Sequence, residues 1–395
     1  GDTVVLTANT GTGAISIQGE ITGAGYTLTL NGSGDSPLLN FDGTITAAST
    51  LDLTIEADEN NTIDCLGTGT FNNVIIDNTG YTTTLTHTLE CASLTLTAGT
   101  LDTGSDKALT VTGKTIIGPN SGAADQATLT CNDSDISLGA AYTADYALEV
   151  KRGGTFDGGS GTHTSGALKV TTDDNANAKF DFTSGVHTIT AEYLSQNRFF
   201  ELTAGTVTHS NGTITLDSAV DTEIQWTANG DGGPYNLILN DSGMIVRARN
   251  ALTVLNDLTI TAGTYNTYSS GGGADKDLTV AGALKVTGTL TGNNSTIIIG
   301  TDGVNPAIEA GALWVESTGS FTFGNGDVTS YGGITAKGTN TLTSSGTGDL
   351  YIAGRTNNGM LTSHSNKGIN ITGDVIVSYG SNSNFDCRGG PEITC

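Results

Sequence analysis

Residues 278–290 read Leu-Thr-Val-Ala-Gly-Ala-Leu-Lys-Val-Thr-Gly-Thr-Leu, so that Leu278, Leu284 and Leu290 recur at a regular spacing. Around each leucine an apolar residue alternates with threonine or lysine, which is typical of a strand with one buried and one solvent-facing side. A glycine follows each short strand, and glycine turns the chain with little strain. A short strand followed by a glycine corner is what a coil with flat sides requires.

The same alternation occurs along most of the chain. Threonine or lysine stands between the two apolar residues of pairs that span 28–30, 94–96, 109–111, 168–170, 214–216, 252–254 and 284–286. Threonine suits the outer side of a strand because its branched Cβ fits the pleat and its hydroxyl faces water. Asn211-Gly212 and Asn229-Gly230 are among the dipeptides that we expect at corners, since both residue types tolerate positive φ. The fold class is therefore all-β.

Three landmarks recur at almost one offset. Residues 71–80 (Phe-Asn-Asn-Val-Ile-Ile-Asp-Asn-Thr-Gly) are echoed by residues 235–243, and residues 94–100 return as residues 258–264. Leu148-Glu149-Val150 returns as Leu313-Trp314-Val315. This spacing predicts an internal duplication of about 164 residues. The expected organisation is N-terminal solenoid rungs in 1–70, one repeat block in 71–234 and a second in 235–395.

The strands cover nearly the whole chain without a linker or a change of composition, and similar strand pairs recur roughly 20–26 residues apart. We therefore expect a single elongated, right-handed parallel β-helix (β-solenoid), with an array of β-sandwich domains as the alternative. The chain has 56 Gly but only 5 Pro among its 395 residues, and this excludes collagen. Neither end shows a capping helix, which favours either end-to-end or side-by-side association with further copies or a chain cut from something longer.

The formal net charge of −25, with only 15 Lys and Arg, predicts repulsion from nucleic acids and anionic membranes. No apolar run approaches the ~18 residues of a membrane span. Solubility and the binding of divalent cations at acidic turns both explain the acidity. Residues 173–177 have the Asp-x-Asn-x-Asn rhythm of a calcium loop, but Ala178 and Ser184 replace the glycine and glutamate of an EF-hand. We expect no cofactor, and calcium is the one ion that the sequence leaves open.

The spacings of the five cysteines match no zinc pattern. Cys387 and Cys395 are close in the sequence, so we expect them to form a disulfide at the C-terminal end. Cys65, Cys91 and Cys131 are expected to be small buried side chains within strands. A stacked pair of Cys65 and Cys91, whose separation is close to one turn of a solenoid, is left open.

Residues 71–76 and 94–102 resemble the aromatic-Asn-Leu-x-Ile-x and Leu-Thr-x-x-Gly-Thr-Leu segments of large secreted and surface proteins of bacteria. Similar segments occur in fibre-like structural proteins of bacteriophages. More broadly, the chain resembles the parallel β-helices of filamentous-haemagglutinin-like adhesins. The resemblance covers residues 71–395 as two copies and residues 1–70 more loosely. It implies extracellular or virion display, adhesion and self-association, and it supplies no catalytic residues.

Catalytic motifs are absent from the sequence, and the five histidines are widely separated along it. We expect them to be solvent-facing or hydrogen-bonded strand residues, although a solenoid could stack distant ones on one face. Arg247 and Arg249 form the best basic pair. Either they neutralise acidic neighbours, or they contact an acidic glycan or a partner subunit.

These observations predict a structural protein of a fibre, filament or cell surface and not an enzyme. Its expected partners are further copies of itself and a cell-surface glycan or host surface, and its expected location is extracellular. A bacteriophage tail fibre or virion appendage is one alternative. A glycan-degrading β-helix enzyme is the alternative from another class, for which Arg247 and Arg249 would be the residues to change.

Overall fold

The computed structural model describes residues 3–7, 15–22, 25–31, 38–46, 50–119, 126–170, 178–269, 273–301, 312–338, 341–353, 360–363, 369–377 and 384–386. These residues form strands and turns and contain no α-helix. The chain divides into two units. The first holds residues 1–212 and 227–231, and the second holds residues 213–226 and 232–395.

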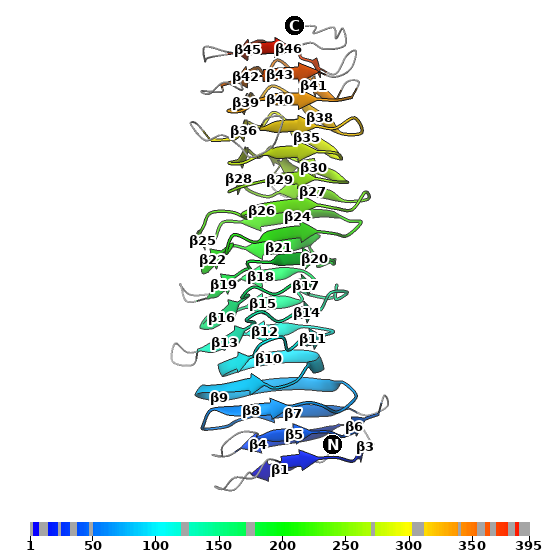
Figure 1. Ribbon diagram of the computed structural model, residues 1–395, viewed down its shortest axis with the longest axis vertical. Helices are drawn as coiled ribbons and strands as arrows, with labels where there is room; N and C mark the ends of the chain where they lie inside the picture. Colours follow the sequence, from blue (N-terminus) through cyan, green and yellow to red (C-terminus); the bar gives the residue numbers. More distant parts are fainter. Residues whose placement is uncertain are drawn as a thin grey trace. The chain divides into compact units, whose positions relative to one another are not determined.

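In the first unit the strands stack in parallel into three ladders (Figure 1). The first ladder contains β1 (Thr3–Thr7), β4 (Tyr26–Asn31), β7 (Leu51–Ile55), β9 (Phe71–Leu85), β10 (Leu89–Asp102), β12 (Thr115–Ile117), β15 (Leu148–Val150), β18 (Leu168–Val170) and β21 (Arg198–Leu202). The second contains β2 (Ile15–Ile17), β5 (Leu39–Phe41), β8 (Asn61–Asp64), the ends of β9 and β10, β13 (Ala127–Thr130), β16 (Gly154–Asp157), β19 (Lys179–Asp181), β22 (Thr206–Thr208) and β25 (Asn229–Gly230). The third contains the start of β10, β11 (Leu109–Val111), β14 (Ile136–Leu138), β17 (His163–Ser165) and β20 (Val186–Ile189), and β3 (Glu20–Ile21) pairs separately with β6 (Thr44–Ile45).

The second unit repeats this arrangement. One ladder contains β23 (Thr213–Leu216), β26 (Asn236–Leu239), β29 (Leu258–Ile260), β34 (Leu284–Val286), β37 (Leu313–Val315), β40 (Ile334–Ala336), β43 (Met360–Ser363) and β46 (Asn384–Asp386). Another contains β24 (Asp221–Trp226), β27 (Ile245–Ala248), β30 (Thr264–Asn266), β35 (Thr289–Asn293), β38 (Ser320–Phe323), β41 (Leu342–Ser344) and β44 (Ile369–Asn370). The last contains β28 (Leu252–Val254), β33 (Leu278–Val280), β36 (Ile297–Ile299), β39 (Val328–Ser330), β42 (Leu350–Ile352) and β45 (Val375–Val377). A short antiparallel hairpin joins β31 (Tyr268–Ser269) to β32 (Ala274–Asp275).

Apolar side chains at alternate positions form the core inside the ladders. In the first unit Leu53, Val74 and Leu94 occupy equivalent inner positions on successive turns, and none of them is accessible to solvent. Each turn therefore covers the inner side chains of the turn before it, as expected for a stack in which stability arises between neighbours. The strand pairs predicted from alternation all lie in strands, with both apolar residues of each pair buried.

The prediction of a parallel, stacked β-solenoid is confirmed. Right-handedness and the internal duplication, with its blocks 1–70, 71–234 and 235–395, stay predictions. Asn211 does make a corner, with φ of +59°. Asn229-Gly230 is not a free corner, because these residues form β25 and pair with Thr206 and Val207. Gly230 nevertheless has the positive φ, +113°, on which the prediction was based.

The number of residues in a turn varies. Ile75 pairs with Thr95 on the next turn, whereas Ile116 pairs with Glu149, so the second of these turns contains many more residues. The corner at Gly159 (φ +57°) shows why glycine is needed where turns meet closely. A Cβ atom at this position would clash with the carbonyl oxygen of Asn132 on the preceding turn.

Candidate binding face and charged clusters

Threonine and aspartate side chains line the outer side of the second ladder of the first unit in two parallel files. We call this surface the Thr/Asp face. One file contains Thr82, Thr100, Thr128, Thr155, Lys179, Thr206 and Asn229. The other contains Thr62, Thr84, Asp102, Thr130, Asp157, Asp181 and Thr208. The ladder pairing places each member directly beside the next member of its file.

Alternation along each strand produces this face. The residue between the two outer side chains points inward and is fully buried, as in Leu101, Leu129, Phe156, Phe180 and Val207. Neighbouring strands lie about 4.8 Å apart, and alternate residues of one strand lie about 6.6 Å apart. The outer side chains therefore form a flat, regular array of hydroxyl and carboxylate groups, in which Lys179 and Asn229 are the exceptions.

The carboxylates of the Thr/Asp face also support the corners beside it. Asp102 Oδ1 accepts hydrogen bonds from the Gly104 amide and from Asn132 Nδ2, each at 2.7 Å. Asp157 Oδ1 accepts one from the Gly159 amide at 3.2 Å. These contacts hold the aspartates in place and tie successive turns together, so the outer surface is ordered before any partner arrives.

A charged column lies on the outer side of the first ladder. Glu149, Lys169 and Glu201 occupy paired positions on β15, β18 and β21. Lys114 Nζ contacts Asp145 and lies 2.9 Å from Glu149 Oε2. Burial alone would lower the pKa of Lys114, but its hydrogen bonds to the two carboxylates raise it, so the lysine stays charged. The column is a set of neutralised charges.

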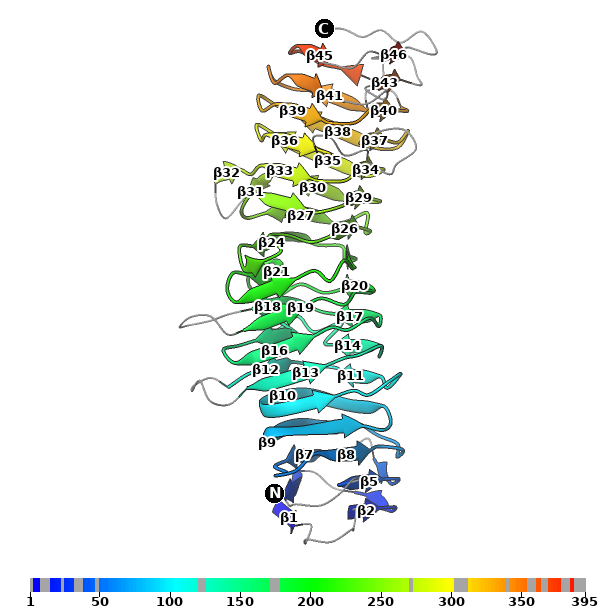
Figure 2. The same ribbon diagram turned by 60° about the vertical axis from the view of Figure 1, so that its left-hand side comes forward.

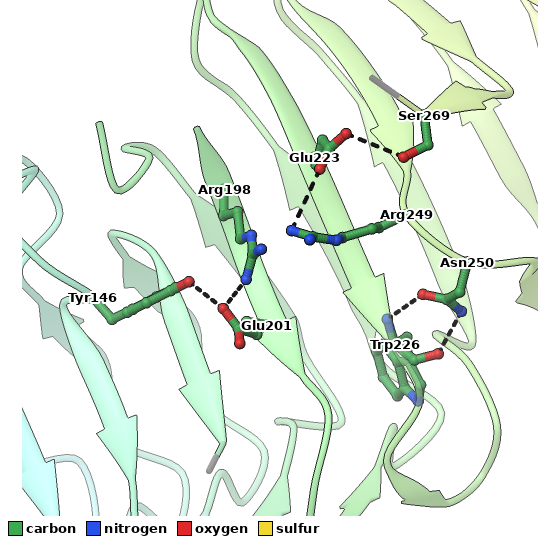
Figure 3. A network of polar contacts seen from close by, with 8 residues as sticks. All are labelled: Tyr146, Arg198, Glu201, Glu223, Trp226, Arg249, Asn250 and Ser269. Carbon is green, nitrogen blue, oxygen red and sulfur yellow. Dashed lines mark hydrogen bonds and ion pairs between the residues drawn. The ribbon is translucent and has the colours of Figure 1, made fainter. Parts of the chain in front are cut away.

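Glu201 is a carboxylate of this column that two neighbouring side chains contact. Its Oε2 atom accepts a hydrogen bond from the Tyr146 hydroxyl at 2.6 Å and is also contacted by Arg198 Nη1 (Figure 3). Tyr146 is 2% exposed. Burial and the bond to Glu201 raise the pKa of Tyr146. The phenol therefore remains protonated and acts as a donor.

Arg247 and Arg249, the predicted basic pair, lie on the outer side of the second unit. Arg247 contacts Asp221, and Arg249 Nη1 lies 3.9 Å from Glu223 Oε2. Glu223 also accepts a hydrogen bond from Ser269 Oγ at 3.2 Å (Figure 3). Neutralisation of acidic neighbours is thus the interpretation that the geometry supports, and contact with a glycan or subunit stays a prediction.

Alanine substitutions separate these two roles of the arginines. Arg247→Ala is expected to lower the free energy of unfolding by less than about 1 kcal/mol, because Asp221 is exposed and screened by water. Arg249→Ala should cost more, because the Glu223 side chain is only 9% exposed. Equilibrium denaturation measures both. Binding to an acidic glycan that is lost in either variant without any change in stability would instead support a contact role.

A cavity of about 470 Å³ lies in the first unit beside residues 65–69. Phe41 and Phe71, whose ring centroids are 5.5 Å apart, line this cavity together with His87 and Glu90. His87 Nδ1 lies 2.7 Å from Asp64 Oδ1. Burial, aided by Asp64, raises the pKa of the Cys65 thiol to about 12, so this cysteine is not an activated nucleophile.

The cysteines within the described residues are free thiols. Cys91 is buried within β10, as expected. Cys131 is buried but follows the end of β13, and Cys65 is half-buried and follows the end of β8. The pKa of Cys91 is raised to about 12 by burial and by the neighbouring Cys65. Cys387 and Cys395, the predicted disulfide, and the calcium-like residues 173–177 lie outside the described residues.

One histidine contradicts the expectation. His163 and His187 occupy paired positions on β17 and β20, which lie on successive turns of the first unit (Figure 2). Both are buried and so not solvent-facing; His187 is hydrogen-bonded to Ser165, as expected, whereas His163 has no hydrogen-bond partner on either ring nitrogen. The alternation of inner and outer positions along β17 and β20 places both histidines inside. This could not be predicted from the sequence, because a polar side chain does not mark an inward position.

Comparison with protein-family models, curated proteins and solved structures gave no match. Within the described ranges, no three His, Cys, Asp or Glu side chains gather closely enough to hold a metal ion. The same ranges contain no helix with the length and apolar character needed to traverse a bilayer.

The Thr/Asp face was not among the sites predicted from sequence, although the sequence contains a pattern that marks its strands. Threonine or aspartate flanks one inward residue at 82–84, 100–102, 128–130, 155–157 and 206–208. The pattern identifies outer positions. Only the ladder pairing shows that these positions fall into two continuous files.

Proposed function

We propose that this protein is a structural β-solenoid of an extracellular fibre, filament or cell surface, and that the Thr/Asp face makes its main contact. The two continuous files of this face carry the proposal. A site for catalysis gathers different groups around one reacting atom, whereas a regular flat array suits an extended partner. Further copies of the chain and hydroxyl-rich surface glycans are such partners, and adhesion and self-association are the proposed work.

The charge of the chain defines the conditions for self-association. Copies that each carry a formal charge of −25 repel one another at low ionic strength. Salt screens this repulsion over about 10 Å at 0.1 M, and divalent cations would screen it more strongly. Assembly should therefore increase with salt or calcium.

Electron microscopy of the untagged protein, with and without calcium, tests this proposal. Filaments or bundles would support assembly, and binding of single particles to glycan-coated surfaces would support adhesion. Particles that stay single and bind no surface glycan would contradict the proposal. A bacteriophage appendage remains the alternative with the same physical basis, and a trimeric stoichiometry would favour it.

A matched pair of double variants locates the contact. Thr128→Glu with Thr155→Glu places two charges on neighbouring turns of the Thr/Asp face. We expect assembly or surface binding to weaken on the order of tenfold, which corresponds to about 1.4 kcal/mol. The control is Thr110→Glu with Ser137→Glu, an outward pair on the third ladder. Equal behaviour of the two double variants would exclude the Thr/Asp face as the contact.

A further inference from the structure

Two histidines are buried face to edge in the core of the first unit. His163 on β17 pairs in register with His187 on β20, and the ring centroids are 5.5 Å apart with an interplanar angle of 73°. Each residue is 1% exposed. Phe156 and Phe182 pack edge-on against them at centroid distances of 5.8 and 5.5 Å. An apolar, aromatic environment therefore surrounds two side chains that can take up protons.

The hydrogen bonds define the neutral form of His187. The Ser165 hydroxyl donates to the Gly166 carbonyl at 2.9 Å, so its oxygen is free to accept. It lies 2.8 Å from His187 Nε2, which must then carry the proton. His187 Nδ1 and both ring nitrogens of His163 have no partner. A proton added at any of these nitrogens would create a buried cation without an acceptor.

Charged neighbours provide little compensation. Burial lowers the pKa of His163 to about 4, and the Asp135 carboxylate next to β14 only partly opposes this. Burial, together with repulsion from His163, lowers the pKa of His187 well below its usual value. The neighbouring strands of the second ladder, β16 and β19, contribute Phe156 and Phe180 to the cluster of rings around the two histidines. Neither phenylalanine carries a charge.

We infer that the stacked His163–His187 pair is an acid-sensitive weak point, at which the turns joined by β17 and β20 separate when the surroundings become acidic. In the opened state each imidazole is hydrated and takes up a proton, whereas in the closed state it remains neutral. Both folded pKa values lie below the value of about 6.5 for a free histidine. Stability from the pair is therefore complete above about pH 6.5 and decreases as the pH falls toward the folded values.

The opening equilibrium depends on pH with a defined slope. Between the open and closed pKa values, each histidine changes the opening equilibrium by about tenfold per pH unit. A loosened third ladder would leave unpaired strand edges at β17 and β20. Such edges can pair with another chain, so mild acid is expected to alter how the first unit associates. This consequence does not depend on which partner the Thr/Asp face binds.

Amide hydrogen exchange of the full chain between pH 7.5 and 5, corrected for the intrinsic exchange rate, tests the inference. Protection of β17 and β20 should fall by about tenfold or more per pH unit below about pH 6.5. His163→Phe with His187→Phe should remove this dependence. His163→Gln, which cannot titrate, serves if the double variant does not fold. The matched control is His87→Gln, which removes a half-exposed histidine near Asp64.

Two results would overturn the inference. One is a parallel loss of protection in the wild type and in the variants without His163 or His187, which would assign the acid response to carboxylates. The other is an NMR titration in which both imidazoles of the folded protein titrate near the pKa of a free histidine, since rings that protonate in the closed state cannot drive opening.

Discussion

Replacing Phe180 by alanine is expected to lower the free energy of unfolding by about 3–5 kcal/mol. The Phe180 ring is fully buried, stacks on Phe156 and packs against Phe182, with both centroid distances at 4.7 Å. Its removal leaves a cavity that the neighbouring turns cannot close without breaking their ladder pairing. Equilibrium denaturation, followed by near-ultraviolet circular dichroism, measures the loss.

Phe180→Leu is the control for this substitution, because it keeps most of the apolar volume. We expect it to cost clearly less than the alanine variant. Because each turn is stabilised by its neighbours, hydrogen exchange should increase first at β16 and β19 and least at distant turns. A loss below about 1 kcal/mol for Phe180→Ala would show that the aromatic stack does not stabilise this part of the core.

Replacing Glu201 by alanine is expected to cost about 3–5 kcal/mol, because it leaves Arg198 as an uncompensated buried charge. The Arg198 side chain is only 10% exposed, and Glu201 also satisfies the Tyr146 hydroxyl. Urea denaturation at neutral pH is the measurement. The loss arises from the buried Arg198 guanidinium, which dissolved ions screen only weakly. High salt should therefore reduce the loss of unfolding free energy only slightly.

Two further variants distinguish the contributions of the Glu201 network. Tyr146→Phe removes one hydrogen bond and keeps the ion pair, so its expected cost is about 0.5–1.5 kcal/mol. Arg198→Met with Glu201→Leu removes both charges and should be more stable than Glu201→Ala alone. If the double variant is as unstable as Glu201→Ala, the loss comes from packing and not from the unpaired guanidinium.

Alternation and corner residues predicted the elements of this fold, but not how the turns align. Leu278, Val280, Leu284 and Val286 point inward as their spacing indicates, because apolar side chains leave water wherever the strand is placed. Register follows from the length of each corner, and the sequence marks corner lengths weakly. The pairing of Ile116 with Glu149 across an unusually long turn was therefore not predictable from a regular period.

The charged and polar groups show the same limit. The sequence identified Arg247 and Arg249 but not their partners, because the carboxylates of Asp221 and Glu223 lie one turn away along the ladder. In the same way, residues 163–165 (His-Thr-Ser) read as polar, although they continue the inner file of Ile136 and Leu138. The inward position of a polar residue can be inferred only when the residue paired with it on the preceding turn is known.

The unequal turns show that the number of residues in a turn does not determine how far that turn advances the coil along its axis. The short turn from Ile75 to Thr95 and the long turn from Ile116 to Glu149 each advance the coil by one strand spacing, about 4.8 Å. Residues gained or lost at a corner thus change the outline of one cross-section and leave every ladder in step. The corners can therefore diversify in sequence and size while the outer files keep a constant pitch, so new surface chemistry can be added without redesigning the coil.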